Sequence, residues 1–432
     1  MIDFKHLKES DLEVYNLVMK EYNRQNNCLE MIASENEPSE AVLEAQASYH
    51  TLKYAEGYPG KRYYGGCHVI DETEQLAIDR ACVLFKCKYA NVQPHSGANA
   101  NTAVQFALVP PGGRILGMSL NSGGHLTHGA KPTFSGKYFD VLQYDVNEET
   151  YEIDYKDLEN KLYDFRPHLL IVGASAYPRF IDFKRIREIV DKWNDEKDNF
   201  LYADEIPYCY FMVDMAHIAG LVAADLHSSP IPYADVVTST THKTLRGPRG
   251  GLILTNNEDI IKKVNSAVFP GTQGGPLENI IAAKAVCFGE ALKPEFKTYQ
   301  ADILMNCQTL AVLLKNSGIK LLTGGTDNHL ILLDLRGTGL SGKDLESRLE
   351  EVGIITNKNA IPFDTEKKTI TSGLRLGTAA ITSRGLQVRD MIPIAEVIIA
   401  CVKDTFDEFE EQKNELYNKI HQLCEKYPLY KD

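Results

Sequence analysis

Short apolar runs that alternate with longer helix-forming stretches limit the fold of this chain more than any other feature of its sequence. Between about residues 50 and 280 these runs predict strands at 90–93, 114–118, 139–144, 168–173, 210–214, 234–239 and 251–255. Several runs, such as 169–172, are apolar throughout, which is typical of strands covered on both faces. The pattern predicts an α/β fold with a mostly parallel sheet, in which ligands bind beyond the carboxyl ends of the strands.

The two ends of the chain have different patterns. The helical stretch 276–316 is followed by predicted strands at 329–335, 353–356 and 373–377 and predicted helices at 342–352 and 390–413. We expect three parts, namely an N-terminal helical arm that contacts a partner subunit (1–48), a large α/β domain (49–282) and a smaller α+β domain (283–432). Residues 194–209 are expected to form a surface loop.

The charge and composition of the chain argue against several kinds of partner. The 432 residues carry a net charge of −13, which disfavours binding to nucleic acid or to an anionic membrane. We find no secretory signal and no apolar run near the ~20 residues that span a bilayer, so a soluble cytoplasmic protein is expected. The nine cysteines are scattered, and the spacing of the nearest pair, Cys82 and Cys87, matches no zinc or redox motif. We therefore expect neither a structural metal nor disulfides.

Two charged residues stand at or just after predicted strands. Lys243 follows the strand at 234–239, where a lysine forms a Schiff base when its pocket tunes the amine. Asp214 ends the strand at 210–214, so its carboxylate faces the ligand crevice. Alone, each is more often a surface or capping residue. Together they indicate pyridoxal phosphate, whose ring nitrogen works best when an acid keeps it protonated.

Small and polar residues follow three further strands. Ser96, Gly97 and Ala98 link a strand to a helix, where backbone N–H groups bind a phosphate, although an ordinary turn capped by Ser96 fits equally well. Glycines flank His125 in the run 123–129, and Ser175 follows the strand at 168–173. Because these segments all follow strands of one predicted sheet, we expect them to converge at one crevice.

Arg375 lies on a predicted apolar strand at 373–377. A buried arginine is costly unless it is paired. A bidentate contact with a substrate carboxylate and an internal salt bridge are both consistent with the sequence at this point.

Several longer motifs, at 32–36, 54–66, 123–129, 213–217, 240–251, 269–276 and 357–359, occur in the order found in one enzyme family. From about Leu29 to its C-terminus the chain resembles the serine hydroxymethyltransferases, which are fold-type I pyridoxal-phosphate transferases with an aspartate aminotransferase-like fold. The resemblance implies a seven-stranded sheet in the large domain. It also implies reversible transfer of the hydroxymethyl carbon of serine to tetrahydrofolate through an external aldimine, giving glycine and 5,10-methylenetetrahydrofolate.

The resemblance also implies the site residues. The implied catalytic residues are Lys243, Glu56, Asp214, His125, Tyr64, His217 and His242. The implied cofactor-binding residues are Lys243, Ser96, Gly97, Ala98, His125, Ser175, Asp214, His217, Tyr54 and Gly275. The implied substrate-binding residues are Ser34, Tyr64, Glu56, Arg375, Leu120, Gly124, Leu126 and Asn359. No metal is implied.

Roles follow from the same resemblance. Lys243 would carry the cofactor, and His125 would stack on its ring. Ser34 and Arg375 would bind the substrate carboxylate, while Glu56 would be the favoured proton-transfer group. Ser175 and His217 would contact the 3-hydroxyl side of the cofactor. Leu120, Leu126 and Asn359 would bound the folate site. Tyr54, Glu56, Tyr64 and Gly275 would come from the neighbouring subunit of a homodimer. The sequence does not distinguish a dimer from a tetramer.

Ala98 stands where many family members have serine, so one hydroxyl contact to the phosphate is missing. A folate-independent aldolase is disfavoured by the folate-facing residues. A catalytically idle protein that binds RNA, for instance, is disfavoured by the acidic charge and by the intact Lys243, Asp214 and Arg375.

Overall fold

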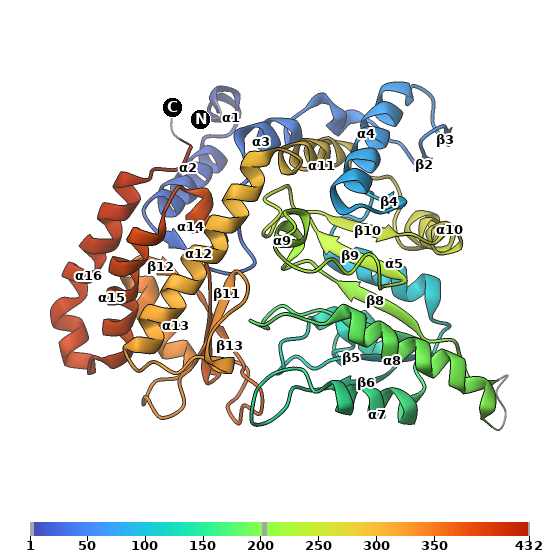
Figure 1. The fold of residues 1–432 in the computed structure, drawn as a ribbon. Helices are drawn as coiled ribbons and strands as arrows, with labels where there is room; N and C mark the ends of the chain where they lie inside the picture. Colours follow the sequence, from blue (N-terminus) through green and yellow to red (C-terminus); the bar gives the residue numbers. More distant parts are fainter. Residues whose placement is uncertain (1–3, 201–204, 431–432) are drawn as a thin grey trace. The chain divides into compact units, whose positions relative to one another are not determined.

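The computed structural model describes residues 4–200 and 205–430 (Figure 1). The chain forms two compact units, one of residues Ala41–Gln300 and the other of residues Met1–Glu40 together with Ala301–Asp432. These units divide the chain after residues 40 and 300, whereas the sequence suggested boundaries after residues 48 and 282. The three-part division therefore stays a prediction.

The 41–300 unit is built on one large sheet. In the described residues this sheet has seven strands in the order β4-β10-β9-β8-β7-β5-β6. They are β4 (Tyr89–Asn91), β5 (Arg114–Met118), β6 (Asp140–Tyr144), β7 (Leu169–Val172), β8 (Tyr210–Asp214), β9 (Val236–Thr240) and β10 (Gly251–Thr255). Only β10 runs antiparallel to its neighbours within the described sheet. The mostly parallel seven-stranded sheet is confirmed.

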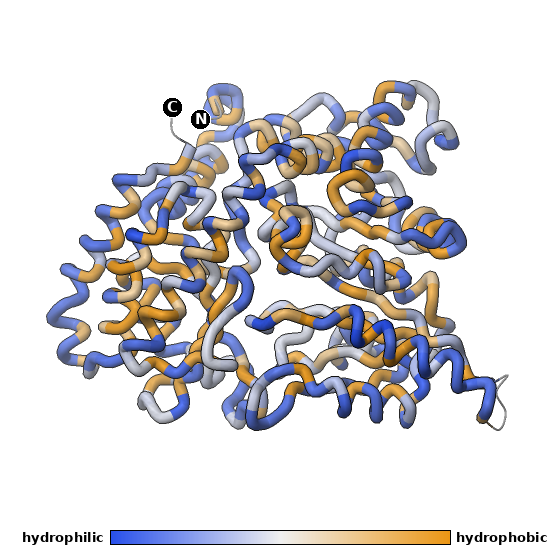
Figure 2. Tube along the Cα trace, in the orientation of Figure 1, coloured by the Kyte–Doolittle hydropathy of each residue, from blue (hydrophilic) through white to orange (hydrophobic). Residues whose placement is uncertain are grey.

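Helices cover both faces of this sheet, and the apolar strands explain why. Leu169 and Ile171 of β7 pack in a core with α5 (Gly97–Leu108) and α10 (Glu258–Ser266), while Leu170 and Val172 pack in the core of the other face. Successive strand residues point to opposite faces, so a run that is apolar throughout needs cover on both. The opposite face carries α4 (His68–Phe85), α7 (Tyr155–Phe165), α8 (Phe183–Glu196) and α11 (Glu278–Ala291). Figure 2 shows apolar sequence along these strands.

The other unit has a separate hydrophobic core around a small antiparallel sheet. Its strand order is β11 (Leu330–Asp334), β14 (Gly373–Gly377) and β13 (Asn357–Asn359). The N-terminal helices α1 (Lys5–Ser10) and α2 (Leu12–Asn26) lead into β1 (Leu29–Glu30), which pairs in parallel with β12 (Ile354–Ile355). The remaining helices of this core include the residues of α12 (Pro294–Asn316) from 301 onward, α13 (Gly342–Glu351), α15 (Met391–Lys403) and α16 (Phe406–Lys426).

Two long helices expected from the sequence are each broken in two. The stretch 276–316 divides into α11 and α12, and Pro294 begins the second helix because proline suits a first helical turn. The stretch 390–413 breaks at Thr405, whose side chain and that of Glu408 form a capping box that starts α16.

The predicted loop at 194–209 is only partly a loop. Helix α8 continues to Glu196, and a short 3₁₀ turn (Lys197–Asn199) follows it. Residues 201–204 of this prediction lie outside the described residues. Among the helices that the structure describes, none combines the length and apolar character needed to cross a bilayer.

Candidate active site

Asp214 lies at the carboxyl end of β8 and is held by three hydrogen bonds. Its Oδ2 accepts from Asn101 Nδ2 (2.8 Å) and His128 Nε2 (3.2 Å). Its Oδ1 accepts from the backbone N–H of Ala216 (3.0 Å). Burial by itself would raise the pKa of Asp214, but the hydrogen bond from His128 and the nearby charge of Lys243 hold that pKa below its ordinary value. The carboxylate is therefore ionised at neutral pH and suited to stabilise a buried cation.

The proton positions around His128 and His125 follow from their partners. His128 Nδ1 accepts from the backbone N–H of His125 (3.2 Å), so its Nε2 carries the proton given to Asp214. His125 Nδ1 accepts from the backbone N–H of Thr127 (3.2 Å) and lies 2.7 Å from the Thr127 hydroxyl. Burial lowers the pKa of His125 to about 4. The His125 ring is therefore neutral and suited to stack on a flat ligand.

Asn101 joins these two groups. Besides its bond to Asp214, its Nδ2 donates to Thr127 Oγ1 (2.8 Å), so the Thr127 hydroxyl proton is directed to His125. Its Oδ1 accepts from Thr238 Oγ1 (2.6 Å) on β9. The buried amide of Asn101 thus fixes the positions of both the Asp214 carboxylate and the His125 ring.

Sequence reasoning missed Asn101 and His128 as members of the site, although His128 lies in the run 123–129 that it singled out. A signal was available for Asn101. It stands four residues after Gly97 on α5, so the two share a helix face.

Lys243 lies in the turn after β9 and is only 8% exposed. Its charge lowers the pKa values of His125, His242 and Asp214, which places it near all three. The next residue, Thr244, donates to the carbonyl of His217 (2.9 Å). The structure therefore places Lys243, Asp214, His125, His217 and His242 near one another, and their roles stay predictions.

His242 is the most strongly perturbed imidazole of this group. Burial, followed by the charge of Lys243, lowers its pKa to about 3. Its Nδ1 is buried without a hydrogen-bond partner among the described residues. His242 is therefore neutral at physiological pH.

The start of α5 offers a place for an anion. Ser96 is the N-cap and accepts from the backbone N–H of Asn99 (3.2 Å), and the first helical turn presents further N–H groups. Backbone and side chains approach each other closely here. A Cβ on Gly97 would lie 2.6 Å from Thr240 Cγ2, and one on Gly251 would lie 2.2 Å from the Ser96 carbonyl oxygen.

The loop 119–126 packs on the turn that carries Ser175. The backbone N–H of Ser175 donates to the carbonyl of Gly123 (2.7 Å), and Gly123 has a φ of +105°. A Cβ on Gly124 would lie 2.1 Å from the Met118 carbonyl oxygen, so this close approach requires glycine. Leu126 is exposed at the end of this loop.

A second group of predicted residues gathers at the surface of the same unit. The rings of Tyr54 and Tyr64 lie 5.1 Å apart, and a Cβ on Gly275 would lie 3.1 Å from Tyr54 Cε1. The charge of Glu56 raises the pKa of Tyr64. Both tyrosines are exposed, so this group is available to another chain.

The remaining predicted residues belong to the other unit. Arg375 is buried on β14, where its Nε donates to Asn357 Oδ1 (3.1 Å) and its Nη2 donates to Ser34 Oγ (3.3 Å). Burial lowers the pKa of Arg375 to about 10, and the charge of Glu35 opposes this effect, so the guanidinium stays positive at neutral pH. Asn359 lies on the neighbouring strand β13.

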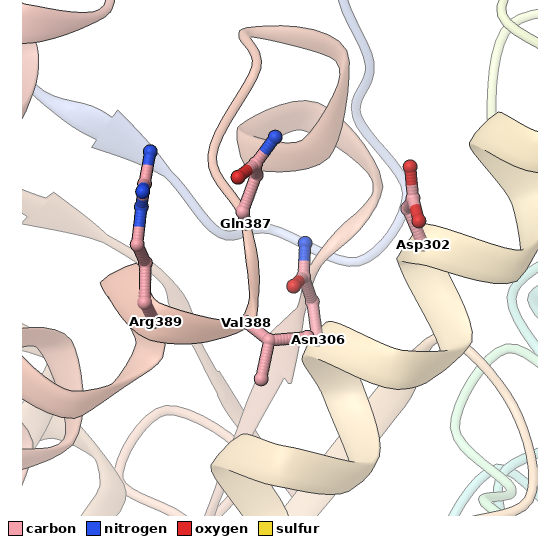
Figure 3. Close-up of a pocket in the computed structure, with 5 residues that line it drawn as sticks. All are labelled: Asp302, Asn306, Gln387, Val388 and Arg389. Carbon is pink, nitrogen blue, oxygen red and sulfur yellow. The ribbon is translucent and has the colours of Figure 1, made fainter.

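A cavity of about 290 Å³ lies in the same unit as Arg375 (Figure 3). Its lining residues come from α12 and the turn before α15, and they are Asp302, Asn306, Gln387, Val388 and Arg389. None of them was predicted to belong to a site, and none is a lysine that a carbonyl cofactor requires.

Comparison with known proteins identifies the family. The family model described as serine hydroxymethyltransferase matches residues 7–398. A serine hydroxymethyltransferase 2 from Ralstonia nicotianae is 54% identical over 427 residues, which cover 98% of this chain and 97% of that protein. Serine hydroxymethyltransferases from Wolbachia pipientis (53% identical over 426 residues, covering 98% and 97%) and Endomicrobium trichonymphae (51% identical over 427 residues, covering 99% of each chain) are similar. The chain belongs to the serine hydroxymethyltransferase family.

Serine hydroxymethyltransferases are pyridoxal-phosphate-dependent enzymes of fold type I, and the residues of this chain fit that cofactor. The 41–300 unit contains a buried lysine, an ionised acid at a strand end, a neutral imidazole and a helix N-terminus for a phosphate.

Proposed function

We propose that this protein transfers the hydroxymethyl carbon of serine to tetrahydrofolate, forming glycine and 5,10-methylenetetrahydrofolate, and that it also catalyses the reverse reaction. The observation that carries the proposal is the network in which Asn101 holds an ionised Asp214 and a neutral His125 beside Lys243. Pyridoxal phosphate, when bound, supplies the electron sink for the bond broken at the amino-acid α-carbon.

The cofactor roles of the residues follow from their charges. Lys243 provides the amine that holds the cofactor, and Asp214 keeps a proton on the ring nitrogen because a buried carboxylate stabilises a buried cation. His125 lies against the ring. The backbone at Ser96, Gly97 and Ala98 binds the phosphate, so Ala98 contributes its N–H without the hydroxyl of a serine. Ser175 and His217 contact the 3-hydroxyl, and His242 completes the pocket.

The substrate roles rest on chemistry and on the family. Arg375 and Ser34 bind the carboxylate of the amino acid, since a guanidinium is the best match for a carboxylate. Glu56 exchanges a proton with the serine hydroxyl, and Tyr64 orients this contact. Contacts with tetrahydrofolate are assigned to Leu120, Gly124, Leu126 and Asn359.

We also propose that the protein acts as a cytoplasmic homodimer in which Tyr54, Glu56, Tyr64 and Gly275 serve the partner's site. Large apolar side chains near this group are exposed, with Tyr49 at 99% and Leu52 at 90%. Such exposed patches are typical of protein interfaces.

Absorbance of the purified holoenzyme tests the proposed reaction. Glycine with tetrahydrofolate should produce a band at the red edge of the cofactor spectrum, and the band should require both ligands. A spectrum that responds to glycine and ignores tetrahydrofolate would instead support the folate-independent aldolase. Absence of any cofactor band would refute both enzyme functions.

Mixing two inactive variants tests the shared site. Lys243→Ala and Glu56→Gln homodimers should each be inactive. After subunit exchange, a mixed dimer contains one site with both native residues, so activity should return. If each site used residues of one chain only, mixing would restore nothing.

A further inference from the structure

Lys284 is a buried lysine for which the proposed chemistry has no role. It lies on α11, which packs on α4 (Figure 1), and it is 1% exposed. Its Nζ donates to the carbonyl oxygens of Val92 (2.6 Å), Gly251 (2.8 Å) and Pro94 (3.0 Å). Three acceptors require three N–H donors, so the geometry describes an ammonium ion.

The three carbonyls belong to the backbone that enters and supports the phosphate-binding turn. Val92 and Pro94 lie between the end of β4 and the N-cap Ser96 of α5. Gly251 begins β10, and its backbone N–H donates to the same Pro94 carbonyl (3.0 Å). Lys284 therefore ties the first strand of the sheet, its neighbour β10 and the segment leading to α5 into one structure.

Gln273 holds the same segment through the intervening peptide groups. Its Nε2 donates to the Gln93 carbonyl (3.1 Å), and its Oε1 accepts from the backbone N–H of His95 (2.9 Å). Successive peptide groups of an extended chain point to opposite sides. Residues 92–95 are thus held from both sides by the side chains of Lys284 and Gln273.

The charge of Lys284 is unusual because nothing neutralises it directly. Across the part of the chain that the structure describes, its ammonium forms no ion pair with a carboxylate, and the carbonyls are its hydrogen-bond partners. Burial lowers the pKa of Lys284 to about 7, and the charges of Glu74 and Glu278 oppose this effect. Burial lowers the pKa of His95, next to Ser96, and the charge of Lys284 acts in the same direction. A positive charge is therefore felt at the turn where a phosphate would bind.

We propose that Lys284, together with Gln273, is a positioning residue that holds residues 92–96 in the conformation that binds the cofactor phosphate, and that its charge strengthens this binding without direct contact. The inference rests on the proposed function, because it assumes that Ser96, Gly97 and Ala98 bind the phosphate of pyridoxal phosphate. In this role Lys284 favours binding of the cofactor phosphate and has little effect on binding of the pyridine ring.

The test compares two ligands that differ only in the phosphate. Apoenzyme is titrated with pyridoxal 5′-phosphate and with pyridoxal. Lys284→Met should weaken binding of pyridoxal 5′-phosphate about tenfold to a hundredfold, as expected for loss of hydrogen bonds made by a charged group. Binding of pyridoxal should change less than about threefold, and kcat at saturating pyridoxal 5′-phosphate should stay close to that of the native enzyme.

Arg80→Met is the matched control. Arg80 donates to the carbonyl of Ala285 on the same helix (2.6 Å), next to Lys284 in sequence, and among the described residues no hydrogen bond joins it to 92–96. This variant should leave the preference for the phosphorylated ligand unchanged.

The outcomes separate the inference from its alternatives. Equal weakening of both ligands by Lys284→Met would assign Lys284 a purely structural role and overturn the proposal, as would unchanged binding. If Lys284→Met does not fold, Gln273→Met at a half-buried position removes the hydrogen bonds on the other side of residues 92–95. It should produce the same selective loss, and unchanged selectivity would overturn the proposal. A native protein that binds neither ligand would refute the proposed function itself.

Discussion

Replacing Asn101 by alanine removes the amide that joins the acid to the imidazole. Asp214 would lose a 2.8 Å hydrogen bond, Thr127 would lose the donor that orients its hydroxyl, and Thr238 would lose its acceptor. A hydrogen bond to a charged group contributes ~1.5–3 kcal/mol. At ~1.4 kcal/mol per tenfold change, we expect kcat/KM for serine to fall about 10- to 150-fold.

The direction of the pKa effect can also be stated. Loss of a donor to the carboxylate raises the pKa of Asp214, because that hydrogen bond favours the ionised form. The native pKa lies below the ordinary value, so the variant still ionises at neutral pH. We therefore expect Asp214 to keep its charge but to lose its alignment with the cofactor ring, so that the ring nitrogen is protonated less. The measurement is a reduced kcat/KM together with a shift in the pH range over which the cofactor absorbance changes.

Gln105→Met provides the control. Gln105 is one turn further along α5, is also fully buried, and donates to the backbone carbonyl of Thr127 (2.7 Å). Its loss should affect folding stability in a similar way but leave Asp214 untouched. The reasoning is refuted if Asn101→Ala stays within about threefold of the native kcat/KM, or if Gln105→Met loses as much activity.

Three further outcomes are expected. Arg384 is buried and donates to backbone carbonyls at the ends of α2 and α16. Arg384→Met should therefore lower the free energy of unfolding, measured by urea titration, by about 3 kcal/mol. A change below about 1 kcal/mol would contradict this expectation. Gly97→Ala places a methyl group 2.6 Å from Thr240 Cγ2, so it should weaken cofactor binding about tenfold, and Thr240→Ser in the same chain should restore it; failure of the second change to help would exclude this clash. Burial lowers the pKa values of His125 and His242 to about 4 and about 3. Between pH 6.5 and 4 the unfolded chain therefore binds protons that the native apoprotein does not. Both imidazoles thus make the free energy of unfolding fall as the pH falls. Replacing both by asparagine should reduce the proton uptake on unfolding at pH 5, measured from the pH dependence of chemical denaturation, and an unchanged uptake would show that the two imidazoles titrate normally.

Much of the fold could be predicted from the sequence because its signals are local. The strands at 114–118, 210–214 and 251–255 occur with the predicted bounds, since each is a short apolar run with turn residues around it. The helix breaks before Pro294 and at Thr405 were missed. Periodicity continues across each break, and only proline or capping chemistry marks them.

Local signals failed in the short strand β13. Residues 357–359 are polar, so no apolar pattern indicates a strand there. The strand forms because Asn357 pairs with Arg375 in the small sheet. Partner residues distant in the chain, rather than its own composition, determine its structure.

The sequence by itself determined which residue types are present after the strand ends, and therefore the kind of chemistry available. Tertiary structure decided which of them meet. Asn101 and Asp214 are 113 positions apart, and Lys284 and Val92 are 192 apart. Such pairs depend on the order of strands in the sheet and on which face each helix covers. A single sequence encodes these choices only through the summed packing of the whole core, so no local pattern reveals them.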